Sequence, residues 1–408
     1  MANVLITWEL GAGLGHLTRL RPVIQRLVEQ GHAAHLAVRD LSSVHPVFGE
    51  IPLRLYQAPI KIGKSAGSTA TPVCFAHILQ NCGFQQASEL IGRLRAWQHL
   101  FDTVAPDLLL HDHSPTALAA ARGTGIPQAI IGTGFICPPA TDPLPSLRPW
   151  LPQASADHTK AEAQTLATVN QALAACAKPE LASLGGLYAV DQVLLTTFKE
   201  LDHYGERPGI RYWGAWPAFP GRPPEWPEPT HGKGKKIFAY LKRSPGLSDL
   251  LKHLRQLGHA TIVYGSWVTD EIQSRHAGPT LQLSQEPLDL QQVAAEADLA
   301  ILNGTHGTSA AMLLGGTPTL QLPIFLEQRL LAERICRFGA GLVANRKNVS
   351  DTITRLHQML GSTSYADRAQ RFAEIYRRVS PSRQFDKMMD ALETLLPDRS
   401  PQNPSESA

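Results

Sequence analysis

The chain has 408 residues, too many for one compact hydrophobic core and enough for two domains. Hydrophobic residues make up 43% and charged residues 18%, a globular balance that excludes a wholly disordered chain. With 38 Lys and Arg against 35 Asp and Glu, the net charge of +3 gives no electrostatic reason to expect nucleic acid as the main partner.

The cysteines and the apolar runs indicate the compartment. The five cysteines are odd in number, widely spaced and without a C-x-x-C pair, so we expect neither a disulfide framework nor a zinc cluster. No apolar run approaches the roughly 18 residues that span a bilayer, and the N-terminus lacks a basic leader segment. We therefore expect a cytoplasmic protein of two domains.

The N-terminal half opens with the pattern of a parallel α/β sheet. Residues 4–8 form an apolar run typical of a buried strand, and a glycine-rich turn over 9–15 leads to a helical pattern over 17–29. A further strand is expected over 33–38. This order predicts the start of a doubly wound sheet.

A second unit of the same kind follows. Residues 108–111 indicate a strand, Ser114 the cap of a helix that Pro115 opens, and 128–131 the next strand.

A Pro-rich segment then divides the chain. Residues 214–236 hold six prolines and four glycines, a density that packed strands and helices do not tolerate, so we predict an interdomain linker. The predicted parts are an N-terminal Rossmann-like domain over 1–213, the linker over 214–236, a C-terminal Rossmann-like domain over 237–380, a last helix over 381–396 with the option of returning to the N-terminal domain, and a disordered tail over 397–408.

The C-terminal half repeats the α/β pattern. Its expected strands are 237–241, 261–264, 299–302 and 319–322. Its expected helices are 247–257, one from Gly307 to the Gly315-Gly316-Thr317-Pro318 stop, 328–338, 350–360, and 365–396 with an interruption at Pro381. We expect two similar Rossmann-like halves.

The first glycine turn carries one candidate site. Gly11, Gly13 and Gly15 allow a sharp turn and close approach of a ligand, but His16 stands where the dinucleotide fingerprint needs its third glycine. His16 begins a helix above the strand ends, where open α/β sheets bind ligands. Asp112 ends another strand of this sheet, and a carboxylate that fixes an imidazole tautomer makes the His a general base. Close packing of the turn and helix capping by Asp112 are the alternatives.

A second candidate site follows the strand over 299–302. Its turn is rich in small polar residues whose N–H groups and hydroxyls suit phosphate oxygens at a helix N-terminus: Asn303, Gly304, Thr305, His306, Gly307 and Thr308. Four charged or polar residues could face the same ligand or be ordinary surface polarity: Lys242, Arg243, Glu327 and Gln328. No strong metal-binding motif is present, and no Walker lysine.

Together these motifs resemble a GT-B glycosyltransferase. The likeness rests on the glycine turn with His16, on Pro106-Asp107-x-x-x-x-Asp112, and on a late motif over 297–345 that is the most specific part. It is to family 1, the UDP-glycosyltransferase-like group, and more distantly to the peptidoglycan N-acetylglucosaminyltransferase. The implied fold is α/β, with two Rossmann-like doubly wound domains that face each other across a cleft.

The resemblance implies an inverting, metal-independent glycosyltransferase without a cofactor. A UDP- or dTDP-sugar would be the co-substrate, and the acceptor would be a hydroxyl of a small or lipid-like molecule. His16 would deprotonate that hydroxyl and Asp112 would steady the imidazolium, whereas the turn over 303–308 would hold the leaving diphosphate. Glu327 and Gln328 would bind sugar hydroxyls.

The resemblance implies that the domain over 1–213 binds the acceptor and the domain over 237–380 binds the nucleotide-sugar, so the acceptor is expected to contact the N-terminal loops. These include Gly13, Gly15 and the segment 59–90, in which Phe75 and Phe84 suggest a lid or pocket wall, with an ordinary surface connection as the alternative. Contact with a membrane surface and the oligomeric state stay open.

Two positions depart from the family pattern on the donor side. Family members commonly carry a His at the position of Asn303, and many carry a Glu that reaches the ribose at the position of Ala311. Two other functions therefore stay open. One is a nucleotide-sugar hydrolase or epimerase, which Gly15-His16-Leu17-Thr18-Arg19 also resembles, and the other is a non-catalytic binding protein that has lost the donor site.

Overall fold

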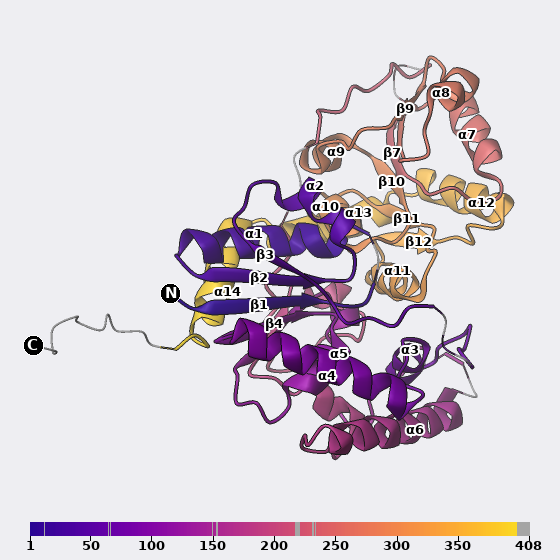
Figure 1. The fold of residues 1–408 in the computed structure, drawn as a ribbon. Coiled ribbons are helices and arrows are strands. Elements are labelled where there is room, and N and C mark those ends of the chain that lie inside the picture. Colours follow the sequence, from indigo (N-terminus) through magenta and orange to yellow (C-terminus); the bar gives the residue numbers. More distant parts are fainter. Residues whose placement is uncertain are drawn as a thin grey trace, which may run out of the picture. The chain divides into compact units, whose positions relative to one another are not determined.

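The computed structural model describes residues 1–11, 13–63, 65, 67–148, 150–151, 154–216, 221–230, 232 and 234–397, and it divides into two compact units (Figure 1). The N-terminal unit comprises Met1–Thr197, Arg207–Trp213 and Phe385–Ala408, and the C-terminal unit comprises Phe198–Glu206 and Gly214–Gln384. Each unit contains a six-stranded parallel sheet with helices around it. The predicted α/β architecture of two doubly wound sheets is confirmed. The tail predicted over 397–408 lies, beyond Pro397, outside the described residues.

The N-terminal sheet has the strand order β3-β2-β1-β4-β5-β6. Its strands are β1 (Asn3–Trp8), β2 (Ala33–Val38), β3 (Arg54–Gln57), β4 (Leu108–Asp112), β5 (Gln128–Gly132) and β6 (Gln192–Leu195). The central strands β1 and β4 are apolar and almost wholly buried, as expected for a parallel sheet covered on both faces. The chain winds outward from β1 in one direction and from β4 in the other, so the topological switch point lies between these two strands.

The helices of the N-terminal unit bury apolar stripes against this sheet. In α1, the residues Leu17, Leu20, Ile24 and Leu27 recur at helical spacing and have no exposed surface. The α-helices are α1 (Gly15–Glu29), α2 (His45–Phe48), α3 (Phe75–Asn81), α4 (Ala87–Val104), α5 (Pro115–Ala121) and α6 (Ala154–Ala175). Short 3-10 turns are η1 (Leu41–Ser43), η2 (Gly134–Ile136) and η3 (Leu184–Tyr188).

The C-terminal sheet repeats this plan with the order β12-β11-β10-β7-β8-β9, so its switch point lies between β7 and β10. Its strands are β7 (Lys236–Tyr240), β8 (Ala260–Tyr264), β9 (Leu281–Ser284), β10 (Leu299–Leu302), β11 (Thr319–Gln321) and β12 (Gly341–Val343). Its helices are η4 (Lys199–Leu201), α7 (Leu247–Gln256), α8 (Asp270–His276), α9 (Leu290–Glu296), α10 (His306–Leu314), α11 (Leu326–Phe338), α12 (Val349–Leu360) and α13 (Ser364–Tyr376).

The Pro-rich segment predicted as a linker belongs to the C-terminal unit. Arg222 forms a parallel bridge with Leu288, and the indole N–H of Trp226 donates to the Glu296 carboxylate at 2.8 Å. Residues 217–220, 231 and 233 of this segment lie outside the described residues. The preceding segment, Phe198–Glu206, is also part of the C-terminal unit, because Phe198 packs in its core against Phe372.

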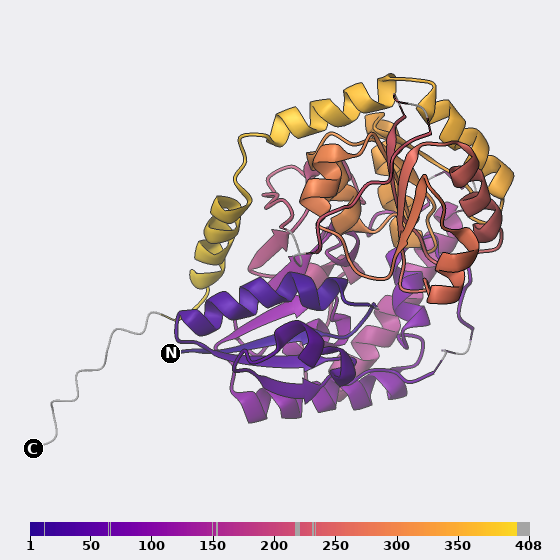
Figure 2. The ribbon, with the colours of Figure 1, turned by 90° about the horizontal axis from the view of Figure 1, so that it is seen from above.

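The last helix, α14 (Pro381–Glu393), follows α13 after a break in the chain direction, drawn in yellow in Figure 2. From Phe385 onward it belongs to the N-terminal unit. There Arg26 of α1 donates to Asp386 at 2.8 Å and lies over the ring of Phe385. The interruption predicted at Pro381 within 365–396 is present: α13 ends at Tyr376 and α14 begins at Pro381, where the first helical position needs no N–H partner.

Candidate functional site

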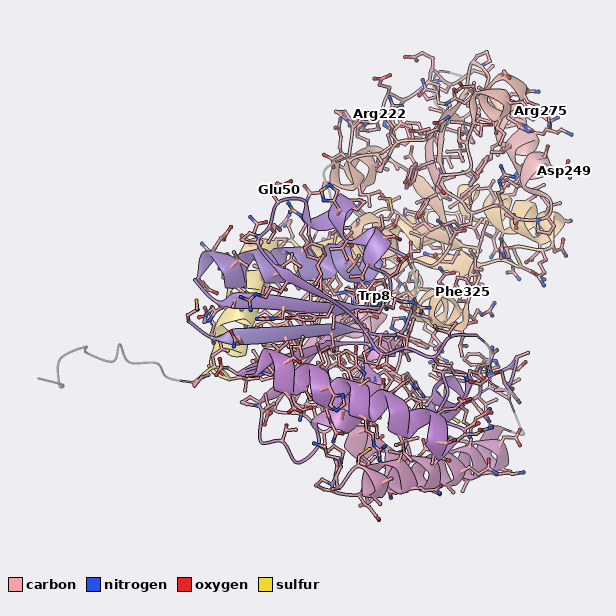
Figure 3. The ribbon with its side chains drawn as sticks, in the orientation of Figure 1. Trp8, Glu50, Arg222, Asp249, Arg275 and Phe325 are labelled. Atoms are coloured by element: carbon pink, nitrogen blue, oxygen red, sulfur yellow. The ribbon has the colours of Figure 1, made fainter. Side chains whose placement is uncertain are left out.

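The carboxyl ends of β1 and β4 form the edge of the N-terminal sheet at its switch point. The register pairs Trp8, labelled at the end of β1 in Figure 3, with Asp112 at the end of β4. Beyond the strands, the Leu10 N–H donates to the His113 carbonyl at 3.0 Å. The two strand ends are thus held side by side, which places the glycine turn after β1 next to Asp112.

His16, Asp112 and Arg19 form a hydrogen-bonded group at this edge. Nδ1 of His16 lies 2.8 Å from Oδ1 of Asp112, and Nη1 of Arg19 lies 3.4 Å from Oδ2. Burial alone would raise the pKa of Asp112, but the charges of His16 and Arg19 and the hydrogen bond to His16 lower it below its usual value. Asp112 is fully buried and ionised, so it can hold the proton on Nδ1 of His16 and leave Nε2 as the acceptor.

Gly11 makes room for the second nitrogen of His16. A Cβ built on Gly11 would collide with Nε2 of His16, and the residue has a φ of +93°. Its carbonyl accepts a hydrogen bond from Arg39 at 2.7 Å, which holds the turn in place. A Cβ added to Gly13, whose φ is +84°, or to Gly15 would meet no other group within 4 Å. Of the three glycines in the motif, Gly11 is the one that the imidazole requires sterically.

Two aromatic rings stack on His16. The Trp8 ring lies 5.1 Å away between centroids at 20°, and the His113 ring lies 6.2 Å away at 21°. His113 adopts a φ of +49°, and burial, followed by the charge of His16, lowers its pKa to about 3. His113 is therefore neutral at physiological pH and adds no positive charge beside His16.

Glu9, which follows β1, is hydrogen-bonded to the helix that follows β4. Its carboxylate accepts a hydrogen bond at 3.0 Å from the N–H of Thr116 in the first turn of α5, and Arg93 lies 3.9 Å from its other oxygen. Burial raises the pKa of Glu9 to about 7, and the bond to Thr116 and the charge of Arg93 offset this only in part. The predicted cap, Ser114, does occupy the N-cap position, but its hydroxyl donates to the Asp112 carbonyl instead. The capping group of α5 is thus a distant carboxylate.

The two phenylalanines of segment 59–90 that are predicted to contact the acceptor, Phe75 and Phe84, have different surroundings. Phe75 begins α3 and packs near the site, with its ring centroid 6.4 Å from that of His113. Phe84 is also fully buried, but its ring packs against the guanidinium of Arg93. Lys64 and Ala66 of this segment lie outside the described residues.

The corresponding edge of the C-terminal sheet is organised by Asn303. Its side-chain oxygen accepts from the Lys242 N–H at 3.2 Å, and its side-chain N–H donates to the Tyr240 carbonyl at 2.8 Å. Asn303 is buried, and these two bonds tie the end of β10 to the end of β7 across the switch point. The side-chain amide of Asn303 therefore has a structural role: it joins the carboxyl ends of two neighbouring strands.

The turn after Asn303 approaches α11 closely. Gly304 has a φ of +78°, and a Cβ there would come within 2.8 Å of the Gln328 carbonyl. The Gln328 side chain in turn accepts from the Ile324 N–H at 2.8 Å, so it closes the loop before α11. Thr305 is the N-cap residue of α10, yet its hydroxyl makes no cap bond and is a buried oxygen without a partner.

The remaining donor-side candidates lie around this edge. Lys242 and Arg243 are exposed, with the Lys242 ammonium 5.5 Å from the centre of the Tyr240 ring. Glu327 is half-buried in the first turn of α11, and His306, Gly307 and Thr308 form the first turn of α10. Ala311 lies one turn further along α10 and packs beside the core of the C-terminal unit.

Within the part of the chain that the structure describes, no three His, Cys, Asp or Glu side chains are grouped so that they could hold a metal ion. Over the same residues, no helix has the length and apolar character needed to cross a membrane.

No protein-family model matches the chain. Its sequence is 23% identical over 316 residues to a PGL/p-HBAD biosynthesis glycosyltransferase of Mycobacterium tuberculosis (strain ATCC 25177 / H37Ra), with 73% of each chain covered. Its structure is similar to that of the glycotransferase of kitacinnamycin, with a TM-score of 0.67, 14% identity, and coverage of 97% of this chain and 99% of the other. It is also similar to the spinosyn rhamnosyltransferase SpnG solved with thymidine diphosphate, with a TM-score of 0.61, 17% identity, and coverage of 95% and 99%.

These comparisons confirm the predicted resemblance to GT-B glycosyltransferases, whereas the more distant likeness to the peptidoglycan N-acetylglucosaminyltransferase stays a prediction. The chain has the GT-B fold, and the proteins to which it is similar are glycosyltransferases, the class of enzyme predicted from the motifs.

Sequence reasoning assigned no site role to Glu9 or His113 of the N-terminal edge, and it named Arg19 only as part of the hydrolase-like Gly-His-x-x-Arg stretch. For Arg19 a signal existed, since it lies three residues after His16 and therefore on the same face of α1. For Glu9, the contact with α5 depends on which strands are neighbours, and no local pattern encodes that contact.

Proposed function

We propose that the chain is an inverting glycosyltransferase that moves a sugar from a dTDP- or UDP-sugar to a hydroxyl of a small acceptor. The observation that carries the proposal is the hydrogen bond between Nδ1 of His16 and the buried Asp112, which directs the basic Nε2 into the space that Gly11 leaves open. A base held in one tautomer and one position is what deprotonation of an alcohol needs.

The reaction transfers one glycosyl group and one proton. The acceptor O–H bond breaks and its proton passes to Nε2 of His16, whose charge Asp112 offsets. The acceptor oxygen forms a bond to the anomeric carbon from the face opposite the nucleotide, and the bond from that carbon to the diphosphate oxygen breaks with its electron pair. The nucleoside diphosphate leaves with the negative charge.

Support for a diphosphate site comes from α10 of the C-terminal unit. The first N–H groups of a helix have no partner within the helix and carry partial positive charge. At this N-terminus Thr305 has a hydroxyl without a partner, and Gly304 keeps the preceding turn close to α11. A thymidine nucleotide is the first candidate, because SpnG was solved with thymidine diphosphate and Ala311 does not supply the acid that would reach a ribose.

The test is a titration with dTDP, UDP and GDP, followed by thermal unfolding. A ligand that binds the native state at a hundredfold excess over its dissociation constant stabilises it by about 2.7 kcal/mol. We expect a shift in unfolding temperature with dTDP or UDP and none with GDP. If none of the three changes the unfolding temperature, the donor site is lost and the chain is a binding protein.

One observation favours a nucleotide-sugar hydrolase as a second candidate. Arg19 shares the Asp112 carboxylate with His16, and both residues belong to the Gly-His-x-x-Arg stretch that resembles such hydrolases. Release of nucleoside diphosphate from the sugar nucleotide at equal rates with and without an acceptor would favour the hydrolase. A rate that depends on the acceptor would favour the transferase.

A further inference from the structure

Two histidines from distant parts of the C-terminal unit face each other on its surface. His253 lies in the last turn of α7, and His357 lies in the last turn of α12. The Nε2 atoms of the two rings are 3.0 Å apart, and the ring planes are inclined at 76°. Over the described part of the chain, neither imidazole makes a hydrogen bond to any other group. We name these two side chains the histidine pair.

The positions of the two histidines are fixed by packing that does not involve their rings. Helices α7 and α12 lie side by side (Figure 1), and Leu254 and Leu356, each next to one of the histidines, are fully buried in the same hydrophobic cluster. The last turn of α12 is also tied to the sheet, because the Lys235 ammonium donates to the Leu360 carbonyl at 3.3 Å. The fold therefore holds the pair together in advance of any ligand.

The two nitrogens can both serve as ligands. At 3.0 Å, one Nε2 carries a proton that it donates to the lone pair of the other, because two lone pairs or two N–H groups would repel. Rotation about the bond between Cβ and Cγ is soft in histidine, so both rings can turn toward one point on the surface. The shared proton then moves to Nδ1 of the same ring, which leaves two Nε2 lone pairs and no net change in protons.

The distance between the nitrogens selects a kind of metal ion. Two nitrogens that are 3.0 Å apart and about 2.1 Å from one ion subtend an angle of about 90° at it. A tetrahedral ion such as Zn²⁺ needs a separation of about 3.3 Å between its nitrogen ligands. A right angle between neighbouring imidazole ligands is typical of tetragonal Cu²⁺ and Ni²⁺ sites.

The charges around the pair act in both directions. The carboxyl ends of α7 and α12 carry partial negative charge, which favours a cation there. Arg255 and Lys252 of α7 repel one, although the Lys252 ammonium lies 3.7 Å from the carboxylate of Asp249, which is labelled in Figure 3. The two imidazoles must therefore supply most of the binding free energy.

We propose that the histidine pair binds a divalent late transition-metal ion, Ni²⁺ or Cu²⁺, with the Nε2 atoms of His253 and His357 as neighbouring ligands and water at the other positions. The ion bridges α7 and α12. It takes no part in sugar transfer, because Lys235, beside the end of α12, precedes β7 at the amino edge of the sheet, whereas the turn after β10 lies at the carboxyl edge. This site goes beyond the proposed function and does not depend on it.

The experiment is a calorimetric titration of the full chain with Ni²⁺, with Mg²⁺ as the comparison ion because it prefers oxygen ligands. We expect one saturable Ni²⁺ site per chain and no binding of Mg²⁺. His253→Gln and His357→Gln should each weaken Ni²⁺ binding by more than about tenfold, since loss of an outer-shell partner alone costs about 10- to 100-fold in metal affinity. The double variant should bind no more weakly than either single variant, because each single change already breaks the chelate.

An exposed histidine of another helix is the matched control. His99→Gln, in α4, should keep the affinity of the parent for Ni²⁺, because that change leaves the histidine pair intact. The unfolding temperature of each variant without metal verifies that it is folded. Electron paramagnetic resonance of the Cu²⁺ complex gives a second measurement, and we expect two nitrogen ligands in the parent and one in either single variant.

Three results would overturn the proposal. The first is absence of saturable Ni²⁺ binding to the parent, and the second is unchanged affinity in both single variants. The third is a fall in the number of bound ions with unchanged affinity, which would mean that the two histidines bind metal independently. Failure of the proposed function has a different signature: Ni²⁺ binding and its loss in the variants persist, while no sugar donor yields a glycosylated product.

Discussion

The carboxyl edges of the two sheets differ in what they present to a ligand. The N-terminal edge places an imidazole, a buried carboxylate and a guanidinium in one hydrogen-bonded group, with aromatic rings stacked on the imidazole. The C-terminal edge presents a turn of small residues and a helix N-terminus, and a buried polar side chain there, Asn303, is committed to holding β7 and β10 together.

The two edges are therefore suited to different chemical tasks, although the two units have the same fold. Proton transfer needs a titratable side chain held in place by other side chains, and the first edge has that arrangement. Anion binding needs unpaired N–H groups and close approach, which backbone and glycine supply. The two edges can be tested separately, because a change at one should leave the task of the other intact.

The largest expected effect is loss of the base. His16→Ala should lower the turnover of sugar transfer by about 10²-fold or more, the scale of general base catalysis, while the dissociation constant for dTDP or UDP stays the same. Steady-state kinetics and nucleotide titration measure the two quantities. His45→Ala, which changes an exposed histidine of α2, is the control and should keep full activity. Undiminished turnover in His16→Ala would remove the base assignment.

The second prediction concerns the buried carboxyl group of Glu9 at the N-terminal edge, whose ionisation should destabilise the folded protein. The folded protein holds the Glu9 proton up to about pH 7, whereas the unfolded chain releases it near the ordinary glutamate pKa of 4.5. The folded state therefore binds more protons in this window, and the free energy of unfolding falls as pH rises through it, by at most about 3 kcal/mol.

Glu9→Gln keeps the acceptor for the Thr116 N–H but removes the ionisation. The free energy of unfolding of the variant, minus that of the parent, should be larger at pH 8 than at pH 5. Urea unfolding of both proteins at both pH values measures this difference. Glu50→Gln, at an exposed position, should follow the parent. If the free energy of unfolding depends on pH in the same way in Glu9→Gln and the parent, ionisation of Glu9 does not destabilise the folded state.

Gly11 and Gly13 form a matched pair. Both have positive φ, +93° and +84°, so alanine strains the backbone at either site, but only at Gly11 would its Cβ meet His16. We expect Gly11→Ala to lower kcat by about tenfold or more beyond the effect of Gly13→Ala, because a displaced base loses its alignment. Equal kcat in the two variants would mean that the imidazole has space to move.

The smallest effect is expected at Thr305 of the second edge. Thr305→Val should weaken nucleotide binding by about three- to tenfold and leave the unfolding temperature of the free protein unchanged, since its hydroxyl has no partner. Thr317→Val should do the reverse, because its hydroxyl donates to the Ala294 carbonyl at 2.8 Å within the core. A drop in unfolding temperature for Thr305→Val, with unchanged affinity, would contradict this division.

Much of this fold was predictable from local patterns. Apolar runs, glycine turns and helical spacing identified β1, α1, β2, β10 and α10 to within a few residues, because burial and turn chemistry act over short stretches of chain. The encounter of His16 with Asp112 was also foreseeable, since parallel strands of a doubly wound sheet end at one edge.

Tertiary structure decided what the polar residues at these edges do. Glu9 rather than Ser114 caps α5, Asn303 joins two strands, and Gly11 alone of three glycines makes room for His16. Each of these depends on contacts between segments far apart in the chain, which the strand order creates and no local pattern contains. The sequence by itself determined which residue types stand at the strand ends. Only the packing of those ends decided which side chains satisfy one another and which stay available for a ligand.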